Sequence, residues 1–307
     1  MVAPTTATGT TATAPAPATH AGVRLTCSIL AGRNPCGHDA RRGYGVNVMP
    51  DPATLQGIVN DFAREPGRSA YVVLRIGDWS WSGGINADEP QPAASLLKLA
   101  IGMAIEDRLD SLESARVSDV LRPTDVSVLH SFSADRELTA HEVHALMLSA
   151  SDAPSARWAT SRAGIPAITA AALESGADRI EIVPDDDFGV LGTITARNAL
   201  DLVVAATDEA RFPACSHALS HSVVNSRIPL GVSAPDIVVA HKSGTLAGVA
   251  NDVAHLTCRE GDAWLAFLSK DQHDTLVTGY EMGLCTRALL ECAGLQAVRS
   301  LSFAHPL

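Results

Sequence analysis

Hydrophobic positions along the chain predict strands near both of its ends. Residues 70–76 form an apolar run, and a Gly-Asp turn separates it from residues 79–82, so the two segments predict a β-hairpin. Three further segments with strand-like composition occur late in the sequence, at residues 237–242, 251–258 and 263–268. Their lengths are typical of strands, so they predict three more.

Between these ends, apolar residues recur with helical spacing. Asp51 followed by proline predicts the start of a helix that ends before Pro66. From Ser95 onward the predicted helix is apolar almost all round, which is typical of a helix buried at the centre of a domain. Helical patterns continue to about residue 206, and a long amphipathic helix is predicted from about Asp274 to Cys292.

This order of elements predicts an α/β protein of the α+β type. One antiparallel sheet would be assembled from the two termini and flanked by helices, with a separate helical lobe. We expect a disordered tail over residues 1–20 and one domain over residues 21–307. Within that domain, the sheet lobe would cover about 21–90 and 226–307, and the helical lobe about 91–225. Ligands usually bind in a cleft between such lobes.

Composition limits the partners of the protein. The chain has 307 residues, 46% of them hydrophobic, and a formal net charge of −11, which argues against nucleic acid or an anionic membrane as a partner. No apolar run approaches the roughly 20 residues needed to span a bilayer. Residues 1–20 lack the basic and apolar regions of a signal peptide. The sequence therefore predicts a cytoplasmic protein, or a secreted one if an upstream signal is missing from this numbering.

Cysteine and histidine give no metal or redox signature. Six cysteines in a chain of this length do not make a disulfide scaffold, so buried thiols are predicted, and whether Cys27 and Cys36 form a disulfide is left open. His141 and His144 are three residues apart and do not form an H-E-x-x-H motif, so we interpret both as helix-surface residues. We expect no metal and no cofactor.

Lysine is scarce, which draws attention to Lys98. The chain has only three lysines, and Lys98 follows Ser95 by three residues, a spacing that puts both on one face of a helix. A buried lysine can lose its proton and act as a base, whereas arginine stays protonated. Alone, S-x-x-K is a weak signal, because an N-cap serine followed by a surface lysine gives the same pattern.

Two later motifs strengthen this interpretation. Ser151-Asp152-Ala153 lies in a polar break between helical segments, and Lys242-Ser243-Gly244-Thr245 ends a predicted strand. A glycine at a strand edge allows close approach of a ligand backbone, and a lysine with two hydroxyls can bind a carboxylate. The motifs therefore predict a small-molecule substrate that carries a carboxylate.

With these three motifs in order, the chain resembles the serine β-lactamase and penicillin-binding-protein superfamily, most closely its class A-like branch, from about residue 70 to 290. That family carries S-x-x-K, S-D-N and K-[ST]-G. The resemblance implies that Ser95 is the nucleophile, Lys98 its base, Ser151 a proton relay to the leaving nitrogen and Lys242 a source of positive potential. It also implies an oxyanion hole from the backbone N–H groups of Ser95 and Thr245. The expected substrate-binding residues are Ser243, Gly244, Thr245, Arg227 and Asp152.

The sequence departs from the family pattern at three places. Ala153 replaces the asparagine of S-D-N, and residues 179–189 contain no E-x-x-x-N for a deacylating water. We interpret Glu181 there as a solvent-facing strand residue and Asp185–Asp187 as a solvated turn. Residues 250–252 lack the arginine that many relatives place there, and Arg227 is either its spatial substitute or a surface charge.

These features predict a serine hydrolase of β-lactamase-like fold that forms an acyl-enzyme on Ser95 with an amide, ester or lactam. The missing glutamate and the absent export signal weaken an antibiotic-resistance role and fit natural-product metabolism, such as antibiotic biosynthesis. An acyltransferase or a D,D-peptidase would use the same acyl-enzyme. A non-catalytic ligand-binding homologue is the remaining alternative.

Overall fold

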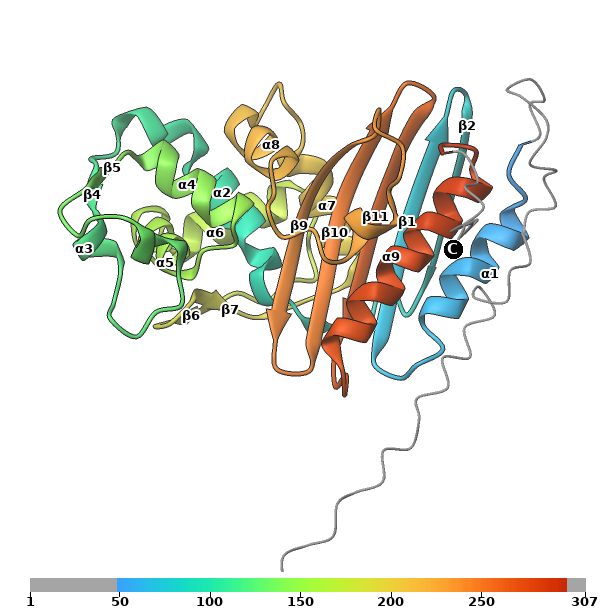
Figure 1. Cartoon of the computed structure of the whole chain (residues 1–307), viewed down its shortest axis with the longest axis horizontal. Helices are drawn as coiled ribbons and strands as arrows, with labels where there is room; N and C mark the ends of the chain where they lie inside the picture. The colour runs from blue at the N-terminus through green and yellow to red at the C-terminus, as the bar shows by residue number, and fades with distance from the viewer. Residues whose placement is uncertain (1–48, 297–307) are drawn as a thin grey trace, which may run out of the picture. The chain divides into compact units, whose positions relative to one another are not determined.

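A five-stranded antiparallel sheet forms the centre of the protein. The structure is a computed structural model that describes residues 49–296 (Figure 1). Its strand order is β2-β1-β11-β10-β9, so strands from both ends of the chain share one sheet, as predicted. The strands are β1 (Arg68–Ile76), β2 (Trp79–Ile85), β9 (Val238–Leu246), β10 (Val249–Cys258) and β11 (Gly261–Ser269).

One face of the sheet is covered by α1 (Pro52–Phe62) and α9 (Thr275–Cys292), which lie across it in Figure 1. Asp51 caps α1 through the backbone N–H groups of Ala53 and Thr54, which confirms the predicted helix start. Side chains alternate along the strands: Val72 packs toward these helices, whereas Val73 packs toward the opposite face. The short 3-10 helix η5 (Ile228–Gly231) packs beside α9.

The other face and the edge strand β9 meet the helical part of the chain, and Figure 1 shows its helices gathered beyond β9. Helix α7 packs directly on the sheet, and η2 and α8 contact β9. The helices of this part are η2 (Ala94–Leu97), α2 (Lys98–Ile105), η3 (Glu106–Ser111), α3 (Val117–Val120), η4 (Val128–Ser131), α4 (Ala140–Ser149), α5 (Ala153–Ala163), α6 (Ile165–Glu174), α7 (Ala196–Ala206) and α8 (Pro213–Ser220).

Six short strands brace the helical part in three antiparallel pairs. The pairs are β3 (Gln91–Pro92) with β8 (Thr193–Ile194), β4 (Ala115–Arg116) with β5 (Glu137–Leu138), and β6 (Val183–Asp185) with β7 (Gly189–Leu191). Glu181 faces solvent as predicted, but it is not in a strand, because β6 begins at Val183 and only an isolated bridge joins Ile180 to Ile194.

The predicted helix from Ser95 begins differently from expectation. Ser95 lies in the 3-10 turn η2, and the regular helix α2 starts only at Lys98. Ala94 has a φ of +49°, a left-handed conformation that an alanine adopts only when its surroundings impose it. The expectation that this helix is buried at the centre of the domain is confirmed, since nearly every residue of α2 is buried.

Several predictions concern residues or features away from the site. Cys215, Cys285 and Cys292 are buried as predicted, whereas Cys258 is only partly buried. The tail and the Cys27–Cys36 pair lie outside the described residues. No helix within residues 49–296 has the length and apolarity to cross a bilayer.

Candidate active site

The segment before Ser95 is tied to the sheet by hydrogen bonds that the sequence did not reveal. Asn251 of β10 donates through Nδ2 to the Pro92 carbonyl at 2.7 Å, and its Oδ1 accepts from Ser269 N at 2.9 Å. Ala93 N donates to the Gly192 carbonyl at 2.9 Å. These contacts fix the chain immediately before the strained Ala94, so Ser95 has a defined place at the sheet edge.

Gly244 of β9 packs directly against this turn. A Cβ at position 244 would lie 3.1 Å from the Ala93 carbonyl oxygen and 3.2 Å from Ser95 N, closer than ordinary contacts. The glycine therefore lets the edge strand approach the backbone of the candidate nucleophile. The structure thus brings the S-x-x-K motif at Ser95 close to the Lys-Ser-Gly-Thr motif of β9, with Ser95 N and Thr245 on neighbouring segments.

Lys98 is almost completely buried, with 3% of its surface exposed. Its Nζ donates to the Ser151 carbonyl oxygen at 2.5 Å and lies 3.5 Å from Ser151 Oγ. Burial lowers the pKa of Lys98 to about 8, and the charge of Asp152 opposes this shift. A substantial fraction of this amine is therefore neutral near pH 8, as a general base requires.

Ser151 connects the two lysines of the site. It has a φ of +58°, and its hydroxyl oxygen accepts a hydrogen bond from Lys242 Nζ at 2.8 Å. Lys242 is 1% exposed and also donates to the Ser243 carbonyl oxygen at 3.0 Å. Burial and the charge of Lys98 lower the pKa of Lys242 well below its ordinary value. Residues far apart in sequence thus form one chain of contacts, Lys98–Ser151–Lys242.

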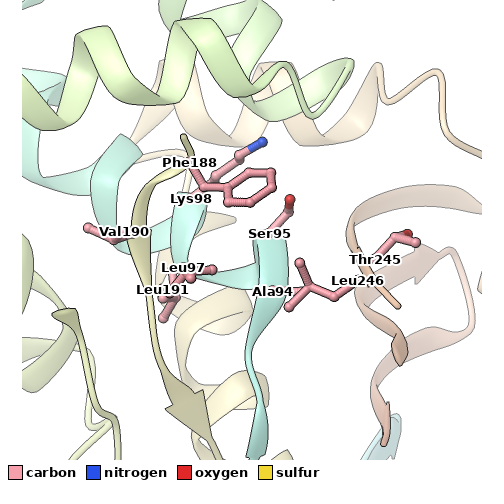
Figure 2. A pocket seen from close by; sticks show the side chains of 9 residues that line it. All are labelled: Ala94, Ser95, Leu97, Lys98, Phe188, Val190, Leu191, Thr245 and Leu246. Carbon is pink, nitrogen blue, oxygen red and sulfur yellow. The ribbon is translucent and has the colours of Figure 1, made fainter. Parts of the chain in front are cut away.

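Two hydroxyls at the site differ in access, because Ser95 lines the pocket whereas Ser243 is buried and does not line it. Within residues 49–296, neither Ser95 Oγ nor Ser243 Oγ makes a hydrogen bond. Figure 2 shows the Ser95 hydroxyl and the Lys98 amine directed toward the same side of the pocket. Catalytic hydrogen bonds often tighten only when substrate binds, so this arrangement is suited to a proton transfer in the complex.

Asp152 lies behind the site rather than in it. It is the N cap of α5: its Oδ2 accepts from Ser155 N at 2.9 Å and from Ser155 Oγ at 2.6 Å, and its Oδ1 accepts from Ser127 Oγ. Both carboxylate oxygens are therefore engaged within the fold. Asp152 acts on the site through its charge near Lys98, and this geometry does not support the predicted direct contact with substrate.

Arg227 is buried, which excludes the surface-charge alternative. It is 6% exposed, its NH1 donates to the Gly244 carbonyl at 2.8 Å and to the Asn251 carbonyl, and its NH2 donates to Thr245 Oγ1 at 2.5 Å. Burial lowers the pKa of Arg227, and the charge of Asp252 opposes this. Arg227 thus supplies positive potential directly behind Thr245, from a loop that sequence spacing alone could not place.

Asp252 anchors this loop and went unrecognised in the sequence. It is fully buried; its Oδ2 accepts from Ile228 N at 3.0 Å and its Oδ1 lies 3.0 Å from His241 Nδ1. The available signal was a pair of polar residues, Asn251 and Asp252, inside a strand that is otherwise buried.

The opposite wall of the pocket is apolar. The pocket beside Ser95 is lined on that side by Phe188, Val190 and Leu191, which belong to the β6–β7 hairpin (Figure 2). No carboxylate of the described residues lines this pocket. Asp185 instead accepts hydrogen bonds from the backbone N–H groups of Asp187 and Phe188, so this part of the acidic turn stabilises its own backbone.

His144 corrects a further prediction, because it is 1% exposed rather than on the helix surface. Its Nε2 lies 3.5 Å from Cys215 Sγ and 3.8 Å from Glu106 Oε2, a grouping with metal-ligand chemistry. Glu106, however, already caps α8 by accepting from Ala214 N at 2.5 Å and Cys215 N at 3.0 Å. Burial lowers the pKa of His144 to about 4, so this imidazole is neutral and packs as a core residue.

Comparisons with known proteins bear on the family and the fold. The model of the β-lactamase enzyme family matches residues 53–282. Among solved structures, a β-lactamase from Sphaerobacter thermophilus DSM 20745 has a TM-score of 0.70 and 20% identity, covering 81% of this chain and 99% of that one. PBP-A has a TM-score of 0.66 and 19% identity, covering 79% of this chain and 96% of that one. No curated protein matches the chain.

A class A β-lactamase from Bacteroides cellulosilyticus DSM 14838 also superposes, with a TM-score of 0.66 and 14% identity over 80% of this chain and 99% of that one. Likeness at such identities establishes the fold, and the family match covers most of the chain. The chain therefore belongs to the β-lactamase enzyme family, within the serine β-lactamase and penicillin-binding-protein superfamily that its three motifs resemble.

Proposed function

We propose that the protein is a serine hydrolase that forms an acyl-enzyme on Ser95 with an amide, ester or lactam substrate. The observation that carries this proposal is the contact chain Lys98–Ser151–Lys242 beside an unengaged serine hydroxyl. Two buried lysines with lowered pKa values are costly to a fold, and such groups concentrate at functional sites.

In the acylation step, neutral Lys98 accepts the proton of Ser95 as Oγ bonds to the substrate carbonyl carbon. The negative charge that develops on the carbonyl oxygen is received by the backbone N–H groups of Ser95 and Thr245, which the close packing of Gly244 brings to neighbouring segments. Each such donor typically contributes about 3 kcal/mol to lowering the barrier.

The carbon–nitrogen or carbon–oxygen bond then breaks, and the leaving atom needs a proton. Lys242 donates to Ser151 Oγ, so the hydrogen of Ser151 is free to point elsewhere. Ser151 gives this proton to the leaving group and regains one from Lys98, which took it from Ser95. The site thereby returns to its starting protonation with the acyl group on Ser95.

A substrate carboxylate would bind at the end of β9. Thr245 Oγ1 accepts a hydrogen bond there from the buried Arg227 guanidinium, and the Lys242 amine and the Ser243 hydroxyl belong to the same strand. Buried cations interact more strongly with an anion than exposed ones, because less water screens them. This cluster supports the expectation of a carboxylate-bearing small molecule.

The fate of the acyl-enzyme distinguishes the alternatives. The wall that faces Ser95 holds no carboxylate to activate water, so we infer slow hydrolysis and a long-lived ester. An amine or alcohol that reaches the ester first would make the protein an acyltransferase, which fits a cytoplasmic role in natural-product metabolism. A D,D-peptidase would share the chemistry but needs access to the cell wall.

The proposal is tested by intact mass after incubation with a fluorescent penicillin and, separately, with a fluorophosphonate probe. We expect a persistent adduct on the wild type and on the control Ser80→Ala, an exposed serine of β2, and none on Ser95→Ala. Rapid release of opened penicillin would identify an efficient β-lactamase instead. No adduct with either probe would overturn the proposal and favour a non-catalytic binding protein.

A further inference from the structure

The side of the pocket opposite β9 is built from hydrocarbon. That side is formed by Phe188, Val190 and Leu191 of the hairpin, next to Ala94 and Leu97 of η2, and Thr245 and Leu246 lie at the β9 end. Phe188 leaves 40% of its surface exposed although it stands next to the candidate nucleophile (Figure 2). Contact with an apolar ligand removes such an exposed aromatic ring from water, which is favourable in free energy.

We propose that the acyl group transferred to Ser95 is apolar and packs against this hydrocarbon wall. The inference rests on the proposed acyl-enzyme and adds the class of acyl group. An acyl chain on Ser95 that reaches the hairpin side meets only the hydrocarbon of Phe188, Val190 and Leu191. A polar chain there would lose hydrogen bonds to water without replacement, because the wall offers no side-chain donor or acceptor.

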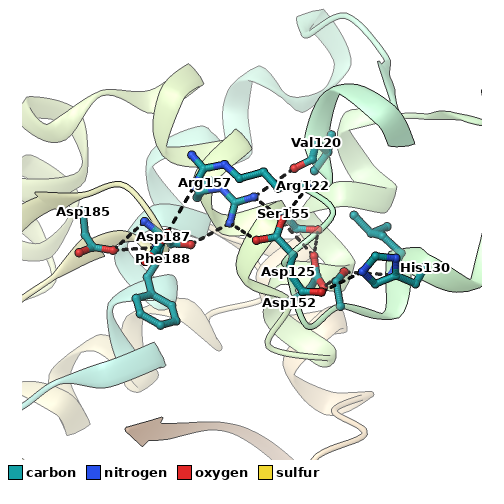
Figure 3. A network of polar contacts seen from close by, with 12 residues as sticks. Val120, Arg122, Asp125, His130, Asp152, Ser155, Arg157, Asp185, Asp187 and Phe188 are labelled. Carbon is teal, nitrogen blue, oxygen red and sulfur yellow. Dashed lines mark hydrogen bonds and ion pairs between the residues drawn. The ribbon is translucent and has the colours of Figure 1, made fainter. Parts of the chain in front are cut away.

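The wall is held in place by a network of charges. Figure 3 shows Arg157 of α5 joined to Asp125 through two hydrogen bonds, of 3.0 and 2.5 Å. Arg157 also donates to the carbonyl of Asp187 at 2.8 Å, and Asp187 immediately precedes Phe188. Because the Arg157–Asp125 pair is only about a tenth exposed, it is a firmer support than a surface ion pair.

Gly189 adds a second support to the same turn. It has a φ of +85°, and a Cβ at this position would lie 2.7 Å from Thr160 Oγ1 and 3.2 Å from the Ala156 carbonyl oxygen, both on α5. The hairpin therefore lies against α5, the helix whose N cap follows Ser151. The apolar wall and the proton relay are thus fixed to one helix, so Phe188 has a set position relative to the reacting groups.

The test uses a matched pair of activated esters, p-nitrophenyl butyrate and p-nitrophenyl methoxyacetate. Their acyl chains have nearly the same size, but an ether oxygen replaces one methylene. The rate of the nitrophenol burst measures acylation, and division by the hydroxide-catalysed rate of each ester removes the difference in electrophilicity. Because one buried methylene is worth about fourfold in partitioning, we expect a corrected preference for butyrate of about four- to tenfold.

Three variants locate the preference. Leu191→Gln, which puts an amide into the wall, should bring the corrected ratio close to one, and Phe188→Ala should reduce it two- to threefold. The control Leu276→Asn changes a leucine that is 81% exposed at the start of α9, and should keep the wild-type ratio. Equal or reversed preference in the wild type, or a ratio unmoved by Leu191→Gln, would overturn the inference.

The two proposals fail in different ways in this experiment. If no ester gives a burst that Ser95→Ala abolishes, the acyl-enzyme itself is wrong. If the burst depends on Ser95 but ignores the polarity of the acyl chain, only the apolar acyl group is wrong. A thermal melt of each variant, with Ser95 reactivity toward the fluorophosphonate probe retained, shows that a changed ratio does not come from unfolding.

Discussion

The two walls of the pocket are built in opposite ways. On the β9 side, Lys242, Arg227 and Asp252 are nearly or fully buried, and a network of hydrogen bonds joins them to strand backbones. On the hairpin side, β6 and β7 are three residues each, and Phe188 is 40% exposed. One wall carries charge inside the fold, and the other presents hydrocarbon at the surface.

This difference separates two tasks of the site. Burying a cation costs free energy of folding. We therefore infer that the buried cations of the β9 side serve bond formation, which needs a fixed electrostatic field. The hairpin wall contributes little charge, and its side chains can change without exposing a buried ion. We therefore expect substitutions on the β9 side to slow acylation, and substitutions on the hairpin side to change which acyl group is accepted and how long it stays.

The largest effect is expected from Lys98→Arg. Arginine stays protonated and cannot accept the Ser95 proton, so the burst rate with p-nitrophenyl butyrate should fall about 10³-fold. The matched control is Lys270→Arg, in the turn after β11, which should remain within about twofold of the wild type. Acylation by a folded Lys98→Arg variant at more than a tenth of the wild-type rate would show that another group is the base.

A smaller, selective loss is expected from Arg227→Gln. The variant removes the charge behind Thr245, so acylation by benzylpenicillin, which carries a carboxylate, should slow about 10- to 100-fold. The neutral ester p-nitrophenyl butyrate should lose less than threefold, and Arg179→Gln, at an exposed surface pair, should change neither. Equal losses for both substrates would mean that Arg227 only supports the strand.

The motif residues of the site were predictable from sequence, and the hairpin wall was not. Ser95, Lys98, Ser151 and Lys242 stand in short motifs, and the scarcity of lysine made them conspicuous. The sheet could be predicted because its strands are long enough to show the hydrophobic pattern of a strand. Arg227 could not be placed, because its partners Gly244 and Asn251 approach it only through the tertiary fold.

The hairpin wall escaped prediction because its strands are too short to show a pattern. Three residues cannot display alternation, and the acidic turn before Phe188 has the composition of a solvated loop. His144 was misplaced for a related reason: its partners, Glu106 and Cys215, lie 38 and 71 positions away along the chain. Local periodicity reports which face is apolar, but it does not report which distant polar groups meet inside the fold.

A change on the hairpin side should alter release rather than acylation. Phe188→Glu places a carboxylate next to Ser95, where it can orient and activate water, so loss of the acyl adduct should accelerate about tenfold. Phe188→Gln is the matched control, because it is polar but a poor base. After excess probe is removed, intact mass recorded over time gives the release rate. The same rate in both variants would mean that the wall excludes water only by its shape.

The smallest expected effect is a displacement of the pH profile by Asp152→Asn. The pKa of Lys98 is about 8, so acylation should rise with pH as the amine loses its proton and level off above that value. The charge of Asp152 raises this pKa, and its removal should therefore move the rising limb to lower pH. Asparagine caps helices as well as aspartate does, so α5 should keep its start.

Asp274→Asn is the matched control for this shift. It makes the same substitution at the N cap of α9, on the far face of the sheet, and should leave the pH profile unchanged. A profile that Asp152→Asn leaves in place, or moves to higher pH, would mean that the titrating group is not Lys98. Lys242, whose pKa responds to the charges of Lys98, Asp252 and Arg227 rather than to Asp152, would then be the group whose proton limits acylation.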